Sequence, residues 1–551
     1  MDKNKNLNVR IEEKLYSRNF KKFGLDLNPV VSIAAGVFFL IFAGFALLNL
    51  EKTQTIFETI KTSILSKGGW VFIVSSNFFI LVCLLLAFSK YGTIKLGGVN
   101  AKTDFSNFAW YSMLISAGMG IGLMFYGVGE PLYHNNTTPP IFKSSNLVNS
   151  ALATTFFHWG IHAWSIYAIV ALALAFFAYN KKLPLSMRSV FYPILKDKVF
   201  GIAGDIIDIL AVIACLFGLA ASLGVGVQQI NSGLNYLTGI PYSVTVQVIL
   251  IIVVTGIATL SVVSGLDKGV KILSKLNIKM AFIFMVCVFL LGPTTYIIKT
   301  FLNSFGLYIN DLIQSSFFIS YKDTSWQVSW SVFYLAWWMS WSPFVGMFIA
   351  RISKGRTIKE FILAVMIIPS LLSFVWFSVF GGSAIFINEG VGGKLFEVVQ
   401  NNLPVALFEM INYLEIPAFT GIIQTVLSIL ATLLIISFFV TSSDSGSLVI
   451  DNITSGGKLD SPVPQRIFWA CMEGLIAAVL LLIGGEEILS ILQTAIITTG
   501  LPLAIVIVIM AITLVGSVKE EYEKQEKIKT VRSHKKVRSI IREEENRNEF
   551  A

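Results

Sequence analysis

A run of glycines inside an apolar stretch, residues 116–130, is the first feature able to do chemistry. Gly118, Gly120, Gly122, Gly127 and Gly129 fall within it. Glycine costs about 1 kcal/mol relative to alanine in a helix interior, so the stretch predicts a helix that breaks. Irregular backbone at membrane depth lines a cavity, where its free carbonyl and N–H groups can bind ions or polar solutes. The alternative is close packing of helices through small residues.

Two aromatic clusters accompany this stretch. Trp164 and Tyr167 are three residues apart, as are Trp338 and Trp341, so each pair shares one face of a helix. Rings gathered in this way can enclose a quaternary ammonium group through cation–π attraction. The alternative for any single tryptophan is a place in the aromatic belt at a membrane surface.

Hydroxyl groups and histidines supply the remaining candidate ligands. Thr441, Ser442 and Ser443 follow one another in an apolar segment, where their oxygens suit a hard cation such as sodium. Hydrogen bonds to the carbonyls of their own helix are the alternative. His158 and His162 are four residues apart, but the sequence shows no third metal ligand, so packing and hydrogen bonding are the favoured interpretation of this pair.

The composition places these residues in a membrane protein. The 551 residues are 55% hydrophobic and 14% charged, with a mean hydropathy of +0.73, well above that of a soluble domain. The net charge of +9 therefore reflects basic loops on one side of a membrane rather than nucleic-acid binding. The four cysteines lie in apolar segments without CxxC spacing, which indicates neither disulfides nor a metal site. No nucleophile–base pair indicates an enzyme.

Twelve apolar segments are long enough to span a bilayer, so the sequence predicts an all-α integral membrane protein. Their approximate cores are residues 29–48, 70–89, 108–127, 151–178, 203–223, 244–263, 281–298, 330–350, 361–380, 420–440, 467–483 and 488–516. The loops on one side hold few basic residues, namely Lys52, Lys61, Lys67, Lys143, Lys299, Lys322 and Lys394. Because basic loops stay in the cytoplasm, both chain ends are predicted to be cytoplasmic in a cell membrane.

Two interrupted helices predict how the segments are organised. The glycine stretch lies in the third segment, and Pro343 and Gly346 are expected to break the eighth. An offset of five segments sends the two in opposite directions through the membrane, as an inverted five-plus-five repeat requires. The predicted parts are a cytoplasmic segment (1–27), two helices outside the repeat (28–105), the first repeat (106–325), the second repeat (326–516) and a charged cytoplasmic tail (517–551).

Three further stretches are expected at the membrane surface. The long loop 387–419 is amphipathic and is predicted to pack on the outer side. Residues 263–279 carry Lys268, Lys271, Lys275 and Lys279 beside leucines and isoleucines, which suits either an interfacial helix or an ordinary basic loop. The tail is either a solvated charged segment or in contact with anionic lipid headgroups.

Four motifs of this chain closely resemble those of the betaine/carnitine/choline transporter family. They are GMGIGLMFYGVGEP (118–131), HWGIHAWSIY (158–167), FYLAWWMSWSPFVGMFIARISKGRT (333–357) and TSSDSGS (441–447). The likeness extends over about residues 28–516. It implies twelve transmembrane helices with a LeuT-type inverted repeat in helices 3–12, alternating access and a homotrimer.

The resemblance also assigns roles to individual residues. The aromatic cage would be formed by Trp159, Trp164, Tyr167 and Trp338, with Trp337 and Trp341 on the substrate path. A sodium site would use the backbone oxygens of Ser116, Met119 and Phe438 and the hydroxyls of Thr441 and Ser442. A second sodium site in betaine symporters uses two threonines. Cys215 and Leu219 stand at these positions here, with Phe344 retained, which puts that site in doubt.

The resemblance further bears on the substrate. Gly122 stands where choline carriers have an acidic residue, which favours a zwitterion such as glycine betaine, whose carboxylate could meet N–H groups of the break at Gly118, Gly120 and Gly122. Leu335 replaces a tryptophan, so a related zwitterion stays open. The leading hypothesis is sodium-coupled symport for osmoprotection, with sodium as coupling ion and no other cofactor. A sodium-independent exchanger or uptake carrier for carnitine, choline or another compatible solute is the alternative, and a membrane sensor is the third.

Overall fold

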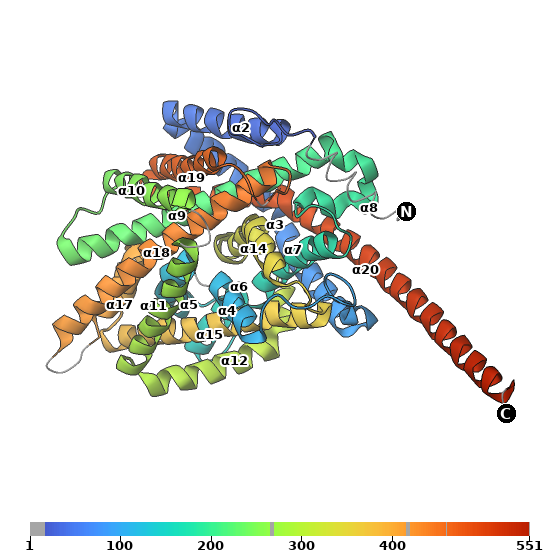
Figure 1. The fold of residues 1–551 in the computed structure, drawn as a ribbon. Coiled ribbons are helices and arrows are strands. Elements are labelled where there is room, and N and C mark those ends of the chain that lie inside the picture. The colour runs from blue at the N-terminus through green and yellow to red at the C-terminus, as the bar shows by residue number, and fades with distance from the viewer. Residues whose placement is uncertain (1–16, 119, 265–268, 415–418, 459, 550–551) are drawn as a thin grey trace.

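The computed structural model describes residues 17–118, 120–264, 269–414, 419–458 and 460–549. Over these residues the chain consists of helices and their connections, gathered in one bundle from which the last helix projects (Figure 1). Eleven helices are long and apolar enough to cross a membrane, or twelve if one bent pair counts as a single span. The predicted all-α membrane protein is confirmed.

The helices have the following bounds along the described chain: α2 (Pro29–Leu48), α3 (Leu50–Phe88), α4 (Asn107–Gly118), α5 (Ile121–Thr137), α6 (Leu147–Trp159), α7 (Ile161–Tyr179), α8 (Tyr192–Leu195), α9 (Ile202–Thr238), α10 (Val244–Ser264), α11 (Gly269–Leu291), α12 (Thr294–Ser316), α13 (Ser325–Gln327), α14 (Phe333–Ile352), α15 (Ile358–Gly390), α16 (Lys394–Asn401), α17 (Ala406–Asn412), α18 (Thr420–Thr454), α19 (Val463–Gly484) and α20 (Ile488–Glu549).

Burial separates central from peripheral helices. α7 is apolar and buried on all sides between His162 and Phe177, as expected of a helix in the middle of a bundle. α2, α10 and α12 instead carry large exposed apolar side chains, among them Ile41, Leu260 and Ile313. These outward side chains are suited to lipid, so the bundle has the surface of a membrane protein.

The predicted break in the glycine stretch is confirmed. α4 and α5 meet at an angle of 62°, and Gly120 before α5 has extended backbone (φ −168°, ψ −171°). The fourth segment, predicted as one helix, is also interrupted, at Gly160 between α6 and α7. A β-carbon on Gly160 would lie 2.4 Å from the Phe156 carbonyl oxygen and 2.7 Å from the Phe374 ring, so this contact requires glycine.

The predicted break of the eighth segment is wrong. α14 runs without interruption through Pro343 and Gly346. Proline deprives the carbonyl four residues earlier of its partner, and that carbonyl, on Met339, accepts a hydrogen bond from Ser342 Oγ at 2.7 Å. Gly346 serves packing, because a β-carbon there would come within 2.6 Å of Val170 on α7. The irregular part of this segment is a π-helical turn, Val328–Val332, before α14.

The seventh predicted segment extends too far. α11 ends at Leu291, and Gly292 and Pro293 separate it from α12, a helix that the apolar pattern did not reveal. Lys271, Lys275 and Lys279 belong to α11 itself rather than to a separate interfacial helix, and Lys268 lies outside the described residues. The amphipathic loop after α15 forms two short helices, α16 and α17.

The two faces of the bundle need names. The side at which α9 begins and α18 ends is called the termini side, because the first described residues lie there. Arg18, the second residue that the structure describes, places its Nη2 2.7 Å from Asp205 Oδ2 on α9. α20 continues unbroken into the charged tail, and its Glu521 lies 3.2 Å from Lys181 on this side. α4 also begins here, where Asn107 accepts a hydrogen bond from Arg356. The side at which α9 ends and α18 begins is called the opposite side.

Candidate substrate and ion site

A cavity of about 770 Å³ leads from the termini side into the bundle. Its outer part is lined by the beginnings of α4 and α11, including Lys275 and Phe108, and the Phe108 side chain is 83% exposed. Its inner part reaches Gly122 and Trp159, which adjoin the breaks of the third and fourth spans. The cavity therefore opens to the termini side and ends where two helices are interrupted.

The predicted aromatic residues meet in this cavity, which is lined by Trp159, Trp164, Tyr167, Trp337, Trp338 and Trp341. The rings of Trp159 and Trp338 stand edge to face with centroids 4.9 Å apart. Tyr167 lies 6.2 Å from Trp338 and 5.3 Å from Trp164. Residues from α6, α7 and α14 thus form one group of rings whose faces can attract a cation.

Hydrogen bonds hold the tryptophan rings in place. Trp338 Nε1 donates to the His158 carbonyl at 2.9 Å, and Trp337 Nε1 donates to Ser222 Oγ at 3.0 Å. Trp341 Nε1 is buried without a hydrogen-bond partner among the described residues, and its ring packs on Phe344 at 5.5 Å. Hydrogen bonds therefore fix the orientation of Trp337 and Trp338, whereas packing alone holds the Trp341 ring.

The five glycines serve different purposes. A β-carbon on Gly118 would lie 2.8 Å from the Trp164 ring, and one on Gly122 would lie 2.7 Å from the Trp159 ring. These two glycines make room for the cage. Gly120 has nothing within 4 Å of such a carbon and marks the break itself. Gly127 packs on Trp376 and Gly129 on Leu403, so close packing through small residues accounts for the last two.

Part of the predicted sodium site borders the same cavity. Ser116 on α4 and Thr441 and Ser442 on α18 line it, and Phe438 is buried one helical turn earlier on α18. Met119 lies outside the described residues. Thr441 Oγ1 donates to the Ser437 carbonyl at 2.9 Å, which is the back-bonding alternative, and accepts from Asn277 at 3.2 Å.

The doubtful second sodium site has few oxygen donors. Cys215 and Leu219 are buried on α9, and the Leu219 side chain fills the space beside Gly446 on α18. Phe344 lines the cavity. A thiol, an alkyl group and a phenyl ring are poor ligands for a hard cation, so these three side chains cannot form an oxygen-rich site.

Glu130 is a buried acid at the inner limit of the cage, and its role was not predicted. Its Oε2 accepts from Trp159 Nε1 at 2.8 Å and from the Tyr334 hydroxyl at 2.6 Å. Its Oε1 lies 2.7 Å from His158 Nδ1. Glu130 therefore orients one cage ring directly, and it touches the residue whose carbonyl holds Trp338. The predicted third segment ends at residue 127 and leaves Glu130 out, whereas α5 runs to Thr137 and carries this acid buried. A lone acid directly after an apolar segment is the signal that could have found it.

Glu130, His134 and His158 each offer one ligand atom, and these atoms lie within 4.8 Å of one another. Such a set can hold a metal ion, yet the bonds of Glu130 already engage its carboxylate, and His158 Nε2 contacts Ser331 Oγ at 2.9 Å. His162 Nε2 contacts Asn77 at 3.2 Å instead. The pair His158 and His162 thus serves two separate hydrogen-bonded groups, in line with the interpretation favoured from the sequence.

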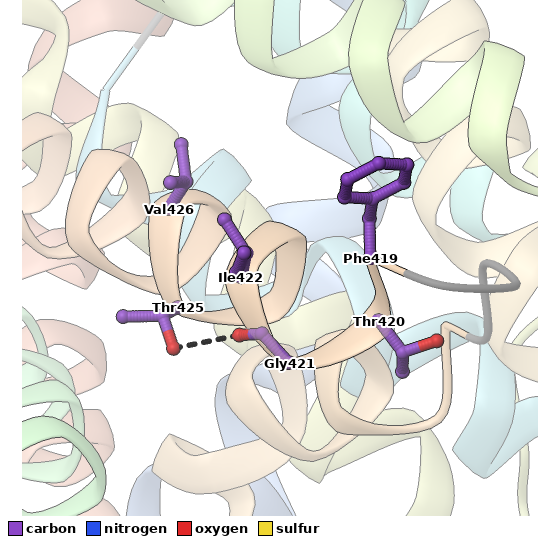
Figure 2. A pocket seen from close by; sticks show the side chains of 6 residues that line it. All are labelled: Phe419, Thr420, Gly421, Ile422, Thr425 and Val426. Carbon is purple, nitrogen blue, oxygen red and sulfur yellow. Dashed lines mark hydrogen bonds between the residues drawn. The ribbon is translucent and has the colours of Figure 1, made fainter.

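A second hollow lies at the start of α18 and is shown in Figure 2. Its lining comes from a single segment, residues 419–426, and includes no charged side chain. The Thr425 hydroxyl donates to the Gly421 carbonyl at 2.8 Å within the helix. A depression on one helix gives a ligand no second wall, so the aromatic cavity is the candidate site.

The chain is similar to several membrane transporters. It is 46% identical over 514 residues to glycine betaine transporter 1 of Vibrio parahaemolyticus, covering 91% of this chain and 96% of that one. It is 46% identical to a glycine betaine/proline/choline/ectoine transporter of the same organism, covering 91% and 89%. It is 41% identical to a glycine betaine transporter of Acinetobacter baylyi, covering 92% and 76%.

Among solved structures, a manganese transporter of Eremococcus coleocola overlaps 75% of this chain and 83% of its own, at 15% identity and a TM-score of 0.41. The model of the betaine/carnitine/choline family of transporters matches residues 30–523. With that match over most of the sequence and relatives above 40% identity, the chain belongs to the betaine/carnitine/choline transporter family and is a transporter rather than an enzyme.

Proposed function

We propose that the protein is a sodium-coupled symporter of a quaternary-ammonium zwitterion, glycine betaine first among the candidates, and that it serves osmoprotection. The observation that carries this proposal is the aromatic cage in a cavity also bordered by Ser116, Thr441 and Ser442. A trimethylammonium group cannot donate N–H hydrogen bonds, so ring faces are its natural partners. The names of the relatives from Vibrio and Acinetobacter support the substrate class.

The start of α5 provides for the substrate's carboxylate. Ile121, Gly122 and Leu123 border the cavity, and no side chain caps the N-terminus of this helix. Free N–H groups at a helix N-terminus attract anions. Gly122 adds no acid to oppose the carboxylate, so the two ends of the site complement the two charges of a zwitterion.

We further propose that the termini side is cytoplasmic, because the basic loops lie there. The cavity then opens inward, and the opposite side is closed by packed rings: Tyr126 and Tyr334 are 5.4 Å apart, and Trp330 and Tyr334 are 6.2 Å apart. Transport would alternate between this form and one open outward, using an inverted repeat of helices 3–12. A homotrimer and contact of the basic tail with anionic lipid belong to the same proposal.

Coupling to sodium sets how far the substrate can be concentrated. One charge moving through 100 mV releases about 2.3 kcal/mol, and a tenfold sodium gradient adds about 1.4 kcal/mol. One ion therefore supports accumulation of about 500-fold, and two ions support about the square of that.

The test is uptake of radiolabelled glycine betaine into proteoliposomes with an inward sodium gradient, compared with potassium in place of sodium. We expect uptake in sodium only, strongly reduced in Trp338→Ala and reduced in Ser442→Ala. Glu389→Gln, an exposed position on α15, serves as the control.

Equal uptake in both salts would contradict sodium coupling and favour the sodium-independent carrier. Absence of uptake in either salt would contradict the substrate. Uptake of radiolabelled carnitine, choline, proline and ectoine then decides among related solutes, of which proline, choline and ectoine are named for one relative.

A further inference from the structure

A second acid is buried in the membrane-spanning part of the protein, away from the aromatic cavity. Glu473 on α19 is completely buried, and neither oxygen of its carboxylate has a hydrogen-bond partner among the described residues. A carboxylate taken out of water without partners is strongly destabilised. Acidic residues buried in spanning segments mark sites that bind a cation or a proton.

The surroundings of Glu473 are rich in oxygen. Ser443 on α18 faces its carboxyl group, and Asp444 is close enough to act on its charge. Ser443 Oγ and Asp444 Oδ1 are also buried without hydrogen-bond partners among the described residues. The other oxygen of Asp444 accepts from Ser261 Oγ at 2.7 Å, from α10. Within the described part of the chain, the hydroxyl of Ser443 and the carboxyl groups of Glu473 and Asp444 therefore lie near one another between α18 and α19.

The position of these oxygens relates them to transport. Thr441 and Ser442 line the aromatic cavity, and Ser443 and Asp444 follow them directly on α18. The thiol of Cys215 on α9 lies close enough to Glu473 to be affected by its charge. The acid thus borders the place where the doubtful second sodium site, Cys215 and Leu219, lacks oxygen ligands.

We propose that Glu473, Ser443 and Asp444 form a second sodium site, which is linked through α18 to the first. This inference rests on the proposed sodium symport and gives it a stoichiometry of about two sodium ions per substrate, since hard monovalent cations prefer several oxygen ligands. A proton on Glu473 is the alternative occupant, because a protonated carboxyl group can itself donate a hydrogen bond to a neighbouring oxygen. All three side chains are shut off from water, so exchange of the ion requires α18 to move against α19.

The experiment measures the number of ions per substrate in proteoliposomes containing the full chain. The membrane voltage at which net glycine betaine flux vanishes is determined at fixed sodium and substrate gradients. We expect about two sodium ions for the wild type and for the exposed-site control Glu389→Gln, and about one for Glu473→Gln, with about the square root of the wild-type accumulation. About one ion in the wild type, or about two in Glu473→Gln, would overturn the proposal.

A second measurement covers variants that fold poorly and separates sodium from protons. Sodium stabilises a protein that binds it, so sodium should raise the thermal unfolding midpoint of the purified wild type most. The rise should be smaller in Ser442→Ala, Glu473→Gln and Glu473→Asp, each of which keeps one intact site. No sodium effect should remain in Ser442→Ala/Glu473→Gln. Flux driven by an inward pH gradient without sodium, and lost in Glu473→Gln, would assign a proton to the site and overturn the sodium assignment.

If the wild type shows no sodium-dependent uptake, the proposed symport fails, and the thermal measurement still decides the site. A sodium-induced shift that persists in Ser442→Ala and is lost on further substitution of Glu473 supports the site without the transport cycle. Equal shifts in the wild type and Glu473→Gln overturn it even where sodium-dependent uptake is intact.

Discussion

The third and eighth spanning segments carry similar helix-breaking residues and respond to them differently. Around Gly120 the chain leaves the helix and α5 starts in a new direction. Around Pro343 and Gly346, α14 continues. The carbonyl that Pro343 would leave free has a replacement donor in Ser342, whereas in the described part of the chain no side chain is seen to donate to the last carbonyls of α4. A breaker therefore interrupts a helix where the freed groups have no substitute partner.

The difference gives the two segments different tasks. α14 is a continuous wall that presents Trp337, Trp338 and Trp341 to the cavity. α4 and α5 form a bent pair whose glycines fit closely against rings on neighbouring helices. In our proposal the wall holds the ammonium group, and the bend provides N–H groups and a hinge.

The largest effect is expected at the bend. In Gly122→Val the new side chain would overlap the Trp159 ring, since even a β-carbon would lie 2.7 Å from it. A displacement of the ring by about 1 Å can cost about 100-fold in activity, so we expect glycine betaine uptake to fall by at least that factor. The control is Gly306→Val on α12, where nothing lies within 4 Å. Uptake near the wild-type level in Gly122→Val would show that the bend does not fit the cage.

The wall is probed by Trp338→Ala. Loss of a desolvated cation–π contact costs about 2 kcal/mol, which corresponds to about 30-fold weaker substrate binding. The measurement is the quenching of tryptophan fluorescence by glycine betaine. Trp469→Ala on α19, a tryptophan outside the cavity lining, is the comparison. A smaller loss in Trp338→Ala than in Trp469→Ala would remove Trp338 from the cage.

Most of the architecture could be predicted from the sequence, because long apolar segments occur in a narrow range of structures. The family resemblance, rather than residue spacing, brought together the aromatic residues that line the cavity. The partners of those tryptophans could not be predicted. Glu130 lies 28 residues before His158 along the chain, and Tyr334 lies 204 residues from Glu130. Pairing between such distant residues depends on how helices pack, which apolar periodicity does not encode.

The eighth segment shows the same limit in a different way. Proline and glycine have known local effects, but their result here depends on one hydroxyl, on Ser342, and on one neighbour, Val170. Proline and glycine each lower the stability of a helix, so their presence predicted a break. The structure replaces the hydrogen bond that Pro343 removes with one from Ser342, and the helix continues. At the end of α11 the opposite occurs, because Gly292 and Pro293 do interrupt the helix. The predicted segment 281–298 ran through them because the sequence stays apolar on both sides.

Close packing of the wall is tested by Gly346→Ala. The added methyl group would come within 2.6 Å of Val170, and overpacking of this kind costs about 1–3 kcal/mol. We expect a lower thermal unfolding midpoint for the purified protein. Gly256→Ala on α10 is the matched substitution with nothing within 4 Å, and there the midpoint should rise slightly because alanine favours helix. Equal shifts in both variants would contradict a packing role for Gly346.

The smallest change in stability is expected from removing the hydrogen bond between Ser342 and the Met339 carbonyl, which keeps α14 continuous. Ser342→Ala removes the hydrogen bond to the Met339 carbonyl and leaves that buried acceptor unpaired, at a cost of about 1 kcal/mol. Adding Pro343→Ala supplies a backbone N–H to the same carbonyl, so the double variant should regain stability. Ser378→Ala on α15, whose hydroxyl bonds a carbonyl at 2.7 Å without a following proline, is expected to be nearly neutral. A double-mutant cycle on thermal unfolding measures the coupling. Purely additive effects would mean that Ser342 does not keep α14 continuous, and the contrast with the bend at Gly120 would need another cause.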